Sequence, residues 1–342
     1  MRSNFRVALV FSLLGALLVG WILWGKRHLP AASTATVASA SELGASPGAM
    51  VLDPLQAVPD GALLVTTVDL RAVRQTALGD RLIGKGRRIP GLGLLTEVCG
   101  ADPMQGVDKL AIAVPARAAD ADFGLVGTGR IDADSLLRCA EKVITGRGGQ
   151  PVISPAGSFR VLRDATATEA HAELAVGSSG LVMLSQGSYL QASIDAAEGR
   201  LPNIIRSEEH ASLRRLVRSG AVVATIVLTP ELRQTLAQEL ASQGTPDSPF
   251  ASVTAAAASL SLGDEIGFEL VLQCDSAAAS SSATSMLERL AADRGQALAS
   301  SAPELATLIG ELRFRAQGSA VHVELAIAAD RALLALDALL TR

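Results

Sequence analysis

An uninterrupted run of apolar residues lies close to the N-terminus, from Val7 to Trp24. Its length of about 18 residues is near the minimum that lets a helix cross the hydrocarbon core of a bilayer. Arg2 and Arg6 precede the run, and both tryptophans of the chain lie at its C-terminal end, where indole rings favour the membrane interface. This pattern predicts a membrane anchor over residues 1–28, with a transmembrane helix from Val7 to Trp24.

A cleavable signal peptide is the competing interpretation of the same run. Its apolar core would be about 7–15 residues long and closely followed by a small-residue cleavage site. The nearest such site, Ala38-Ser39-Ala40, lies well beyond Trp24. We therefore favour an uncleaved anchor. Basic residues are almost balanced across the run, so the orientation is taken from the short leader. It favours a single pass through the inner (cytoplasmic) membrane with the body in the periplasm or outside.

Residues 29–50 contain mostly Ala, Ser, Thr, Gly and Pro and show no hydrophobic period. Such a segment cannot bury enough apolar surface to offset its ordering entropy. We interpret it as a flexible linker that holds the body away from the bilayer.

The body alternates between short β-branched runs and helical patterns. A strand over Ala62–Leu70 precedes a helix over Arg71–Ile83, and two further strands precede a helix over Asp132–Ile144. The next predicted elements are strands at Ser158–Arg163, His171–Val176 and Leu181–Ser185, then helices at Ser188–Glu198 and Glu208–Arg218. This order predicts an α+β fold, with a mainly antiparallel sheet and helices on one face.

Three short matches then suggest that the pattern occurs twice. They are Ala62–Leu78 with Ala221–Ala237, Phe123–Val126 with Phe268–Val271, and His171–Val176 with His322–Ile327. Each pair falls on corresponding predicted elements, in the same order. We therefore predict two tandem copies of one α+β repeat, the first over residues 51–219 and the second over residues 220–342.

Several features resemble uncharacterised exported proteins of myxobacteria and their relatives. They are the N-terminal anchor, the opening strand that ends in Val68-Asp69-Leu70, and Cys99–Pro103 followed by Val107–Leu110. The resemblance covers the first half of the body. It implies a location and an architecture, and it implies no activity.

The charge of the body argues against nucleic acid as a partner. The first fifty residues hold four of the 30 basic and one of the 34 acidic side chains, so the remainder carries a net charge of about −7. Affinity for nucleic acid depends largely on neutralising phosphates with Lys and Arg. Aromatic platforms for stacking are also scarce, since the body has one tyrosine, Tyr189, and no tryptophan.

The candidate metal ligands are two copies of a His-x-Glu pattern, His171 with Glu173 and His322 with Glu324. Residues two apart on a strand share a face, so each copy presents an imidazole and a carboxylate together. If the copies met, the four side chains could bind zinc. The alternative is that both pairs occupy the solvated face of an ordinary strand, because the residues between them are apolar. We favour this alternative and predict no metal or other cofactor.

Signals for catalysis are weak. Gly84-Lys85-Gly86 with Arg87 and Arg88 fits neither a P-loop nor a dinucleotide fingerprint and is interpreted as a loop. The body lacks G-x-S-x-G, S-x-x-K and H-E-x-x-H, so no pattern points to a nucleophile or a catalytic zinc.

The three cysteines are Cys99, Cys139 and Cys274. In an oxidising compartment this number suggests one disulfide and one remaining thiol. Cys99 and Cys139 both belong to the first copy, so we favour a bond between them.

These observations favour a non-enzymatic, membrane-anchored, extracytoplasmic binding or scaffold module of the cell envelope, whose partner is an unknown envelope protein. A carrier or sensor of an apolar ligand is the alternative, and a hydrolase is the least favoured class. A polar sheet face would support the binding module, whereas a large apolar cavity would support the carrier.

Overall fold

The computed structural model describes residues 53–83, 99, 105–116, 123–167, 171–242 and 248–340, all within one compact unit, Gly48–Arg342. The predicted anchor Val7–Trp24, the linker 29–50 and the Gly84–Arg88 loop lie outside the described residues. Within the described part of the chain, no helix combines the length and the apolar character that crossing a membrane requires.

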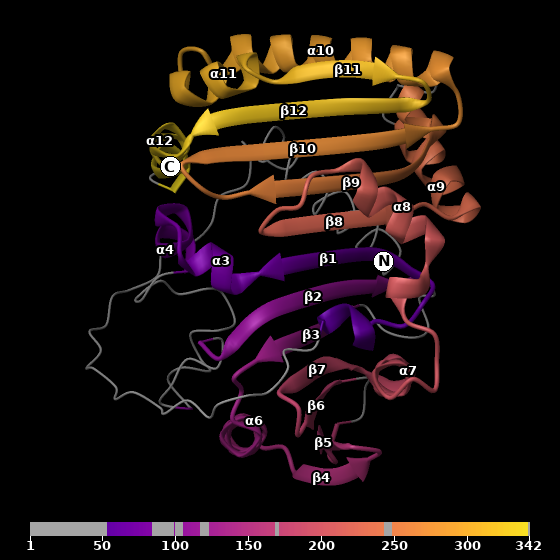
Figure 1. The fold of residues 1–342 in the computed structure, drawn as a ribbon, viewed down its shortest axis with the longest axis vertical. Coiled ribbons are helices and arrows are strands. Elements are labelled where there is room, and N and C mark those ends of the chain that lie inside the picture. Colours follow the sequence, from indigo (N-terminus) through magenta and orange to yellow (C-terminus); the bar gives the residue numbers. More distant parts are fainter. Residues whose placement is uncertain are drawn as a thin grey trace. The chain divides into compact units, whose positions relative to one another are not determined.

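The described strands form a single antiparallel sheet of twelve strands (Figure 1). Their order across the sheet is β11-β12-β10-β9-β8-β1-β2-β3-β7-β6-β5-β4. Their bounds are β1 Ala62–Asp69, β2 Val107–Pro115, β3 Gly124–Gly129, β4 Pro151–Ala156, β5 Phe159–Asp164, β6 Ala172–Gly177, β7 Leu181–Gln186, β8 Val222–Val227, β9 Val253–Ser261, β10 Glu265–Cys274, β11 Arg313–Gln317 and β12 Ala320–Ala328. The predicted antiparallel α+β fold is therefore confirmed at this level.

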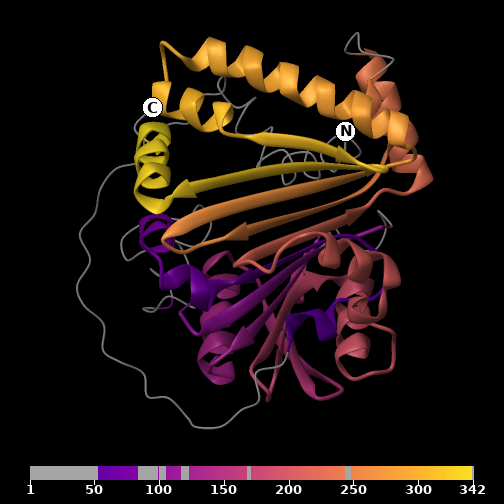
Figure 2. The same ribbon diagram turned by 45° about the horizontal axis from the view of Figure 1, so that its top comes forward.

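Helices and short 3-10 turns connect the strands and cover the sheet (Figures 1 and 2). The α-helices are α3 Leu70–Arg74, α4 Ala77–Ile83, α6 Ala133–Gly146, α7 Gly187–Ala197, α8 Glu208–Leu216, α9 Pro230–Ser242, α10 Ala277–Leu298, α11 Pro303–Gly310 and α12 Ala329–Leu340. The 3-10 turns are η1 Pro54–Ala57, η2 Ile204–Arg206 and η3 Pro249–Ser252.

The helices cover both faces of the sheet, so the prediction of helices on one face was wrong. On β6, Ala175 packs in a core with Leu190 of α7, whereas Val176 packs in a different core with Leu137 of α6. Adjacent residues of a strand point to opposite faces. A strand with apolar side chains on both faces is stable only if helices shield both faces from water, and β6 is such a strand.

The single helix expected over Arg71–Ile83 is two helices, α3 and α4. Thr76 separates them: its hydroxyl donates to the carbonyl of Val73 and accepts from the backbone N–H of Gly79. A side chain that satisfies the first backbone donors of a helix favours a new helix start at that point. Strand β4 was missed, because Pro151 and Pro155 argue against a strand. Both prolines are tolerated there because β4 is an edge strand.

The two predicted copies meet edge to edge at the pair β1–β8, near the middle of the sheet. Two equivalent strands that pair antiparallel are related by a two-fold axis perpendicular to the sheet. Such a rotation leaves equivalent side chains of the two halves on the same face of the sheet. Thr66 pairs with Ala224 at the centre of this contact, and Val65 pairs with Thr225 beside it. Reading outwards, β1-β2-β3-β7-β6 in one half corresponds to β8-β9-β10-β12-β11 in the other.

The register shows that the first sequence match is shifted by one residue. That match aligned Leu64 with Val223, but Leu64 pairs with Ile226 and therefore shares a face with Ala224 and Ile226. The helix starts give the corrected alignment. Asp69 accepts from the backbone N–H of Ala72, and Thr229 accepts from that of Leu232, so Asp69 corresponds to Thr229.

The third match fails, because its two segments occupy different positions in the sheet. His322 lies on β12, which pairs directly with β10, whereas the segment that begins at His171 forms β6, separated from β3 by β7. The strand that corresponds to β12 is β7. Phe123–Val126 and Phe268–Val271 do fall on the corresponding strands β3 and β10. Duplication thus stays a prediction with a revised alignment.

Candidate functional site

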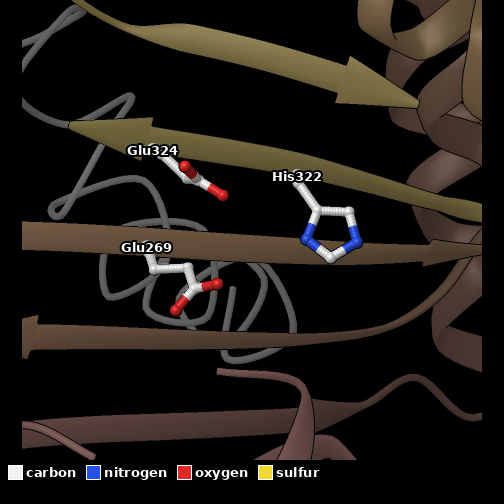
Figure 3. A group of neighbouring side chains, drawn as sticks. All are labelled: Glu269, His322 and Glu324. Atoms are coloured by element: carbon white, nitrogen blue, oxygen red, sulfur yellow. The ribbon is translucent and has the colours of Figure 1, made fainter. Parts of the chain in front are cut away.

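Three potential metal ligands gather on two neighbouring strands in the second half of the sheet. Glu269 lies on β10, and His322 and Glu324 lie on β12 (Figure 3). Glu269 is directly opposite Glu324 in the antiparallel register. The strands fold this way because Val321 and Val323 of β12 are fully buried on the other face, which leaves the alternate positions for polar side chains.

The geometry brings these side chains close together. One nitrogen of His322 and one oxygen from each of Glu269 and Glu324 all lie within 4.8 Å of one another, and all three residues are half-buried. Glu269 Oε2 accepts a hydrogen bond of 2.8 Å from the backbone N–H of Arg218. Glu324 Oε1 lies 3.8 Å from Nη2 of Arg315, in an exposed ion pair that contributes little to stability.

Two carboxylates placed directly opposite each other across a strand pair repel. Arg315 lies near Glu324, and its side chain is 64% exposed, so solvent screens its charge. One imidazole and two carboxylates are side chains of the types that bind metal ions.

The three residues belong to a wider charged area that we call the β10–β12 polar surface. Cross-strand pairing places its members on one face of the sheet. They are Glu269, Gln273, Arg313, Arg315, Gln317, His322 and Glu324. All are exposed or half-buried.

The other His-x-Glu pattern does not join this group, so the four-residue zinc site, which the sequence analysis considered but did not favour, does not form among these side chains. His171 is exposed and precedes β6, and Glu173 faces Ser185 of β7. Seven strands separate β6 from β12 in the sheet. The sequence comparison treated the two patterns as equivalent, but they lie on strands that do not correspond.

Sequence reasoning missed Glu269. The signal was present, because Glu269 interrupts the buried residues Phe268, Leu270 and Val271 of a strand. It could not be linked to His322 without knowing that β12 pairs with β10 and not with another strand.

The cysteines are arranged as expected. Cys99 and Cys139 form a disulfide, with Cα atoms 5.0 Å apart and a sequence separation of 40. Cys274 is the remaining buried thiol. Burial raises its pKa, since the thiolate would lose its solvation, and this does not suit a nucleophile.

A third histidine, His210 of α8, is buried against the β1–β8 contact. Its Nε2 lies 2.9 Å from the carbonyl oxygen of Ala62, and its Nδ1 lies 2.8 Å from the hydroxyl of Thr225. A carbonyl only accepts, so Nε2 carries the proton and Nδ1 accepts from Thr225. Burial lowers the pKa of His210, and the neighbouring Arg214 charge lowers it further, against opposing contributions from the Ala62 carbonyl, Glu209 and Asp60. The imidazole is thus a neutral structural group.

Two of the depressions that the described residues form are shallow, and Glu269 lines neither of them. One, of about 230 Å³, lies between α11 and α12 and is lined by Glu304, Leu308, Arg331 and Leu334. The other, of about 210 Å³, lies beside α7 and β6 and includes Arg163 and Glu173. Ligand pockets for drug-sized molecules usually measure about 300–1,000 Å³ and are mostly apolar.

No family model and no curated protein matches this chain. Among solved structures, it is similar to one titled "Structure of crystal form I of TP0453", with 14% identity and a TM-score of 0.49. The match covers 85% of this chain and 99% of that chain.

Proposed function

We propose that this chain is a non-enzymatic, membrane-anchored binding or scaffold module of the cell envelope, and that it binds a protein through the β10–β12 polar surface. The observation that carries the proposal is this surface. Its exposed and half-buried members carry charges of both signs at fixed register positions, and such patterns select partners by complementary charge.

The two depressions do not favour the alternative, a carrier or sensor of an apolar ligand. They are small, and charged residues contribute to both linings. A hydrolase is not favoured either, because the three side chains that converge, Glu269, His322 and Glu324, include no nucleophilic hydroxyl or thiol.

Photo-crosslinking from single positions tests the proposed surface. A photoreactive residue at Arg315 should give one discrete crosslinked protein in intact cells. The matched control is Arg160 of β5, an exposed arginine far from this surface whose carboxylate partner is Asp134. The double substitution Arg313→Glu/Arg315→Glu should abolish the adduct formed from Gln317. Equal adducts from Arg160 and Arg315, or none from either, would argue against the proposal.

A reporter fusion tests the proposed location separately. Alkaline phosphatase fused after Arg342 should be active and should sediment with membranes, because this enzyme folds only where its disulfides form. Activity in the soluble periplasmic fraction would contradict the anchor, and activity only from a cytoplasmic reporter would contradict the orientation.

A further inference from the structure

We propose that Glu269, His322 and Glu324 form a zinc site on the polar face of strands β10 and β12. Each residue offers one ligand atom, and the three atoms already lie within 4.8 Å of one another on two paired strands. The inference goes beyond the proposed function, since binding of a metal ion requires no partner protein.

The three ligand atoms are slightly further apart than in a zinc complex, and small side-chain movements would bring them to bonding distance from an ion. Zinc bonds to histidine nitrogen and carboxylate oxygen measure about 2.0–2.2 Å, which puts tetrahedral ligand atoms about 3.3–3.6 Å apart. Contraction from the present spacing requires side-chain rotation only, because glutamate has three rotatable bonds and the strands fix the Cβ positions. Figure 3 shows the three side chains on the same side of the two strands, around a common centre.

A hydrogen bond from the surroundings already holds one of the three ligands in place. The backbone N–H of Arg218 binds Oε2 of Glu269, which leaves Oε1 for the metal. Arg315 lies on the Oε1 side of Glu324. Hydrogen bonds and charges that orient metal-binding side chains in this way contribute strongly to affinity.

The donor set selects the metal. One imidazole with two carboxylates suits zinc, whereas magnesium and calcium prefer oxygen ligands alone. Three protein ligands leave the fourth tetrahedral position for a water molecule. Binding would also remove the repulsion between Glu269 and Glu324, which are directly opposite in the register.

The chain contains its own matched control. His171 and Glu173 repeat the His-x-Glu spacing, but the residue opposite Glu173 on β7 is Ser185. If spacing along one strand were sufficient, both patterns would bind. If the carboxylate from the neighbouring strand is required, only the β10–β12 site binds.

The test is calorimetric titration of the tag-free full-length chain, in detergent at pH 7.5, with Zn²⁺ alone. We expect one saturable site. Glu269→Gln and His322→Ala should each weaken it at least about tenfold, since loss even of a supporting residue costs 10–100-fold. The double variant His171→Ala/Glu173→Gln should bind as the unmodified chain does. Circular dichroism identifies a variant that fails to fold, and the visible spectrum of bound Co²⁺ reports on the ligands without any substitution.

Absence of saturable binding by the unmodified chain would overturn the proposal. Equal binding by Glu269→Gln, or a loss of binding in the His171/Glu173 variant, would also overturn it. No partner is present in this titration, so its failure is distinct from a failure of the crosslinking experiment.

Discussion

At the scale of single residues, His210 shows how a polar group can be buried without a role in chemistry. The side chain is 2% exposed, and both ring nitrogens have partners. One partner, Ala62, begins the first half of the sheet, and the other, Thr225, lies at the centre of β8. The imidazole therefore connects the two halves and is held in one tautomer.

Acid should destabilise the protein through this residue. The folded-state pKa of His210 lies below its ordinary value of 6.5, so the unfolded chain binds a proton that the folded chain does not. The contribution of His210 to stability is present above pH 6.5 and is lost as the pH falls towards the folded-state pKa. The free energy of unfolding changes through His210 by at most about 1.4 kcal/mol per pH unit. Urea unfolding at pH 7.5 and 5.5 measures this change in the free energy of unfolding.

One variant separates this effect from other titrations. His210→Gln should lower the stability at pH 7.5 but reduce the difference between the two pH values. An unaltered pH dependence in His210→Gln would contradict the assignment.

At the scale of single elements, the sequence carried most of the strand pattern. β-branched runs and turn residues predicted β1, β5, β6 and β7 closely. The pattern could not give register, because β8 reads Val222-Val223-Ala224 and similar small apolar residues occupy both faces. This explains the one-residue shift in the first match. The capping residues Asp69 and Thr229 distinguish the two alignments, since a cap marks one defined position in each helix.

The candidate site shows the same limit. His322 and Glu324 could be identified from their spacing, but Glu269 depends on which strand pairs with β12, and pairing between strands is a tertiary property. The coverage of both sheet faces was missed for a related reason: Ala175 and Val176 are both apolar, and the prediction assumed that one side of each strand would face water.

Close packing at the end of β3 gives a prediction about a glycine. A Cβ on Gly129 would overlap the backbone oxygen of Gly106, and it would approach Asp108 N to 2.6 Å. Backbone cannot move away without breaking the β2–β3 pairing. Gly129→Ala should therefore destabilise the protein by about 1–3 kcal/mol, as overpacked positions typically do.

The control for this change is Gly146→Ala at the end of α6. A Cβ there has no atom within 4 Å, and alanine favours a helix over glycine by up to about 1 kcal/mol. The melting temperature should thus fall for Gly129→Ala and rise for Gly146→Ala. A neutral Gly129→Ala would show that the two strands can separate locally at low cost.

The disulfide gives a second prediction at this scale. On the chain-entropy model, closing a loop of 40 residues stabilises a protein by about 4 kcal/mol. Cys139→Ser should lower the melting temperature, and a reducing agent should do the same to the unmodified chain but not to the Cys99→Ser/Cys139→Ser variant. Cys274→Ala tests the other thiol, whose loss should not alter the response to the reducing agent.

At the scale of the whole molecule, two groups of strands share one sheet through a single strand pair. The revised alignment predicts that superposing the second half on the first brings β8 onto β1, β10 onto β3 and β12 onto β7. The zinc proposal and the duplication are then independent, because β7 carries no histidine and the metal ligands would belong to one half alone.

The β1–β8 pair also has a consequence for the order in which the chain is synthesised. While the ribosome makes the first half, the edge of β1 that will bind β8 has unpaired N–H and C=O groups beside the buried residues Leu64 and Val65. An open apolar edge of this kind recruits other strands. A chain that stops at Ser219 should therefore self-associate, which light scattering would detect, and adding residues 220–342 as a separate polypeptide during refolding should suppress this association. The open edge of β1 stays unpaired until about 160 further residues have been synthesised. The second half then prevents aggregation of the first half by pairing with this edge.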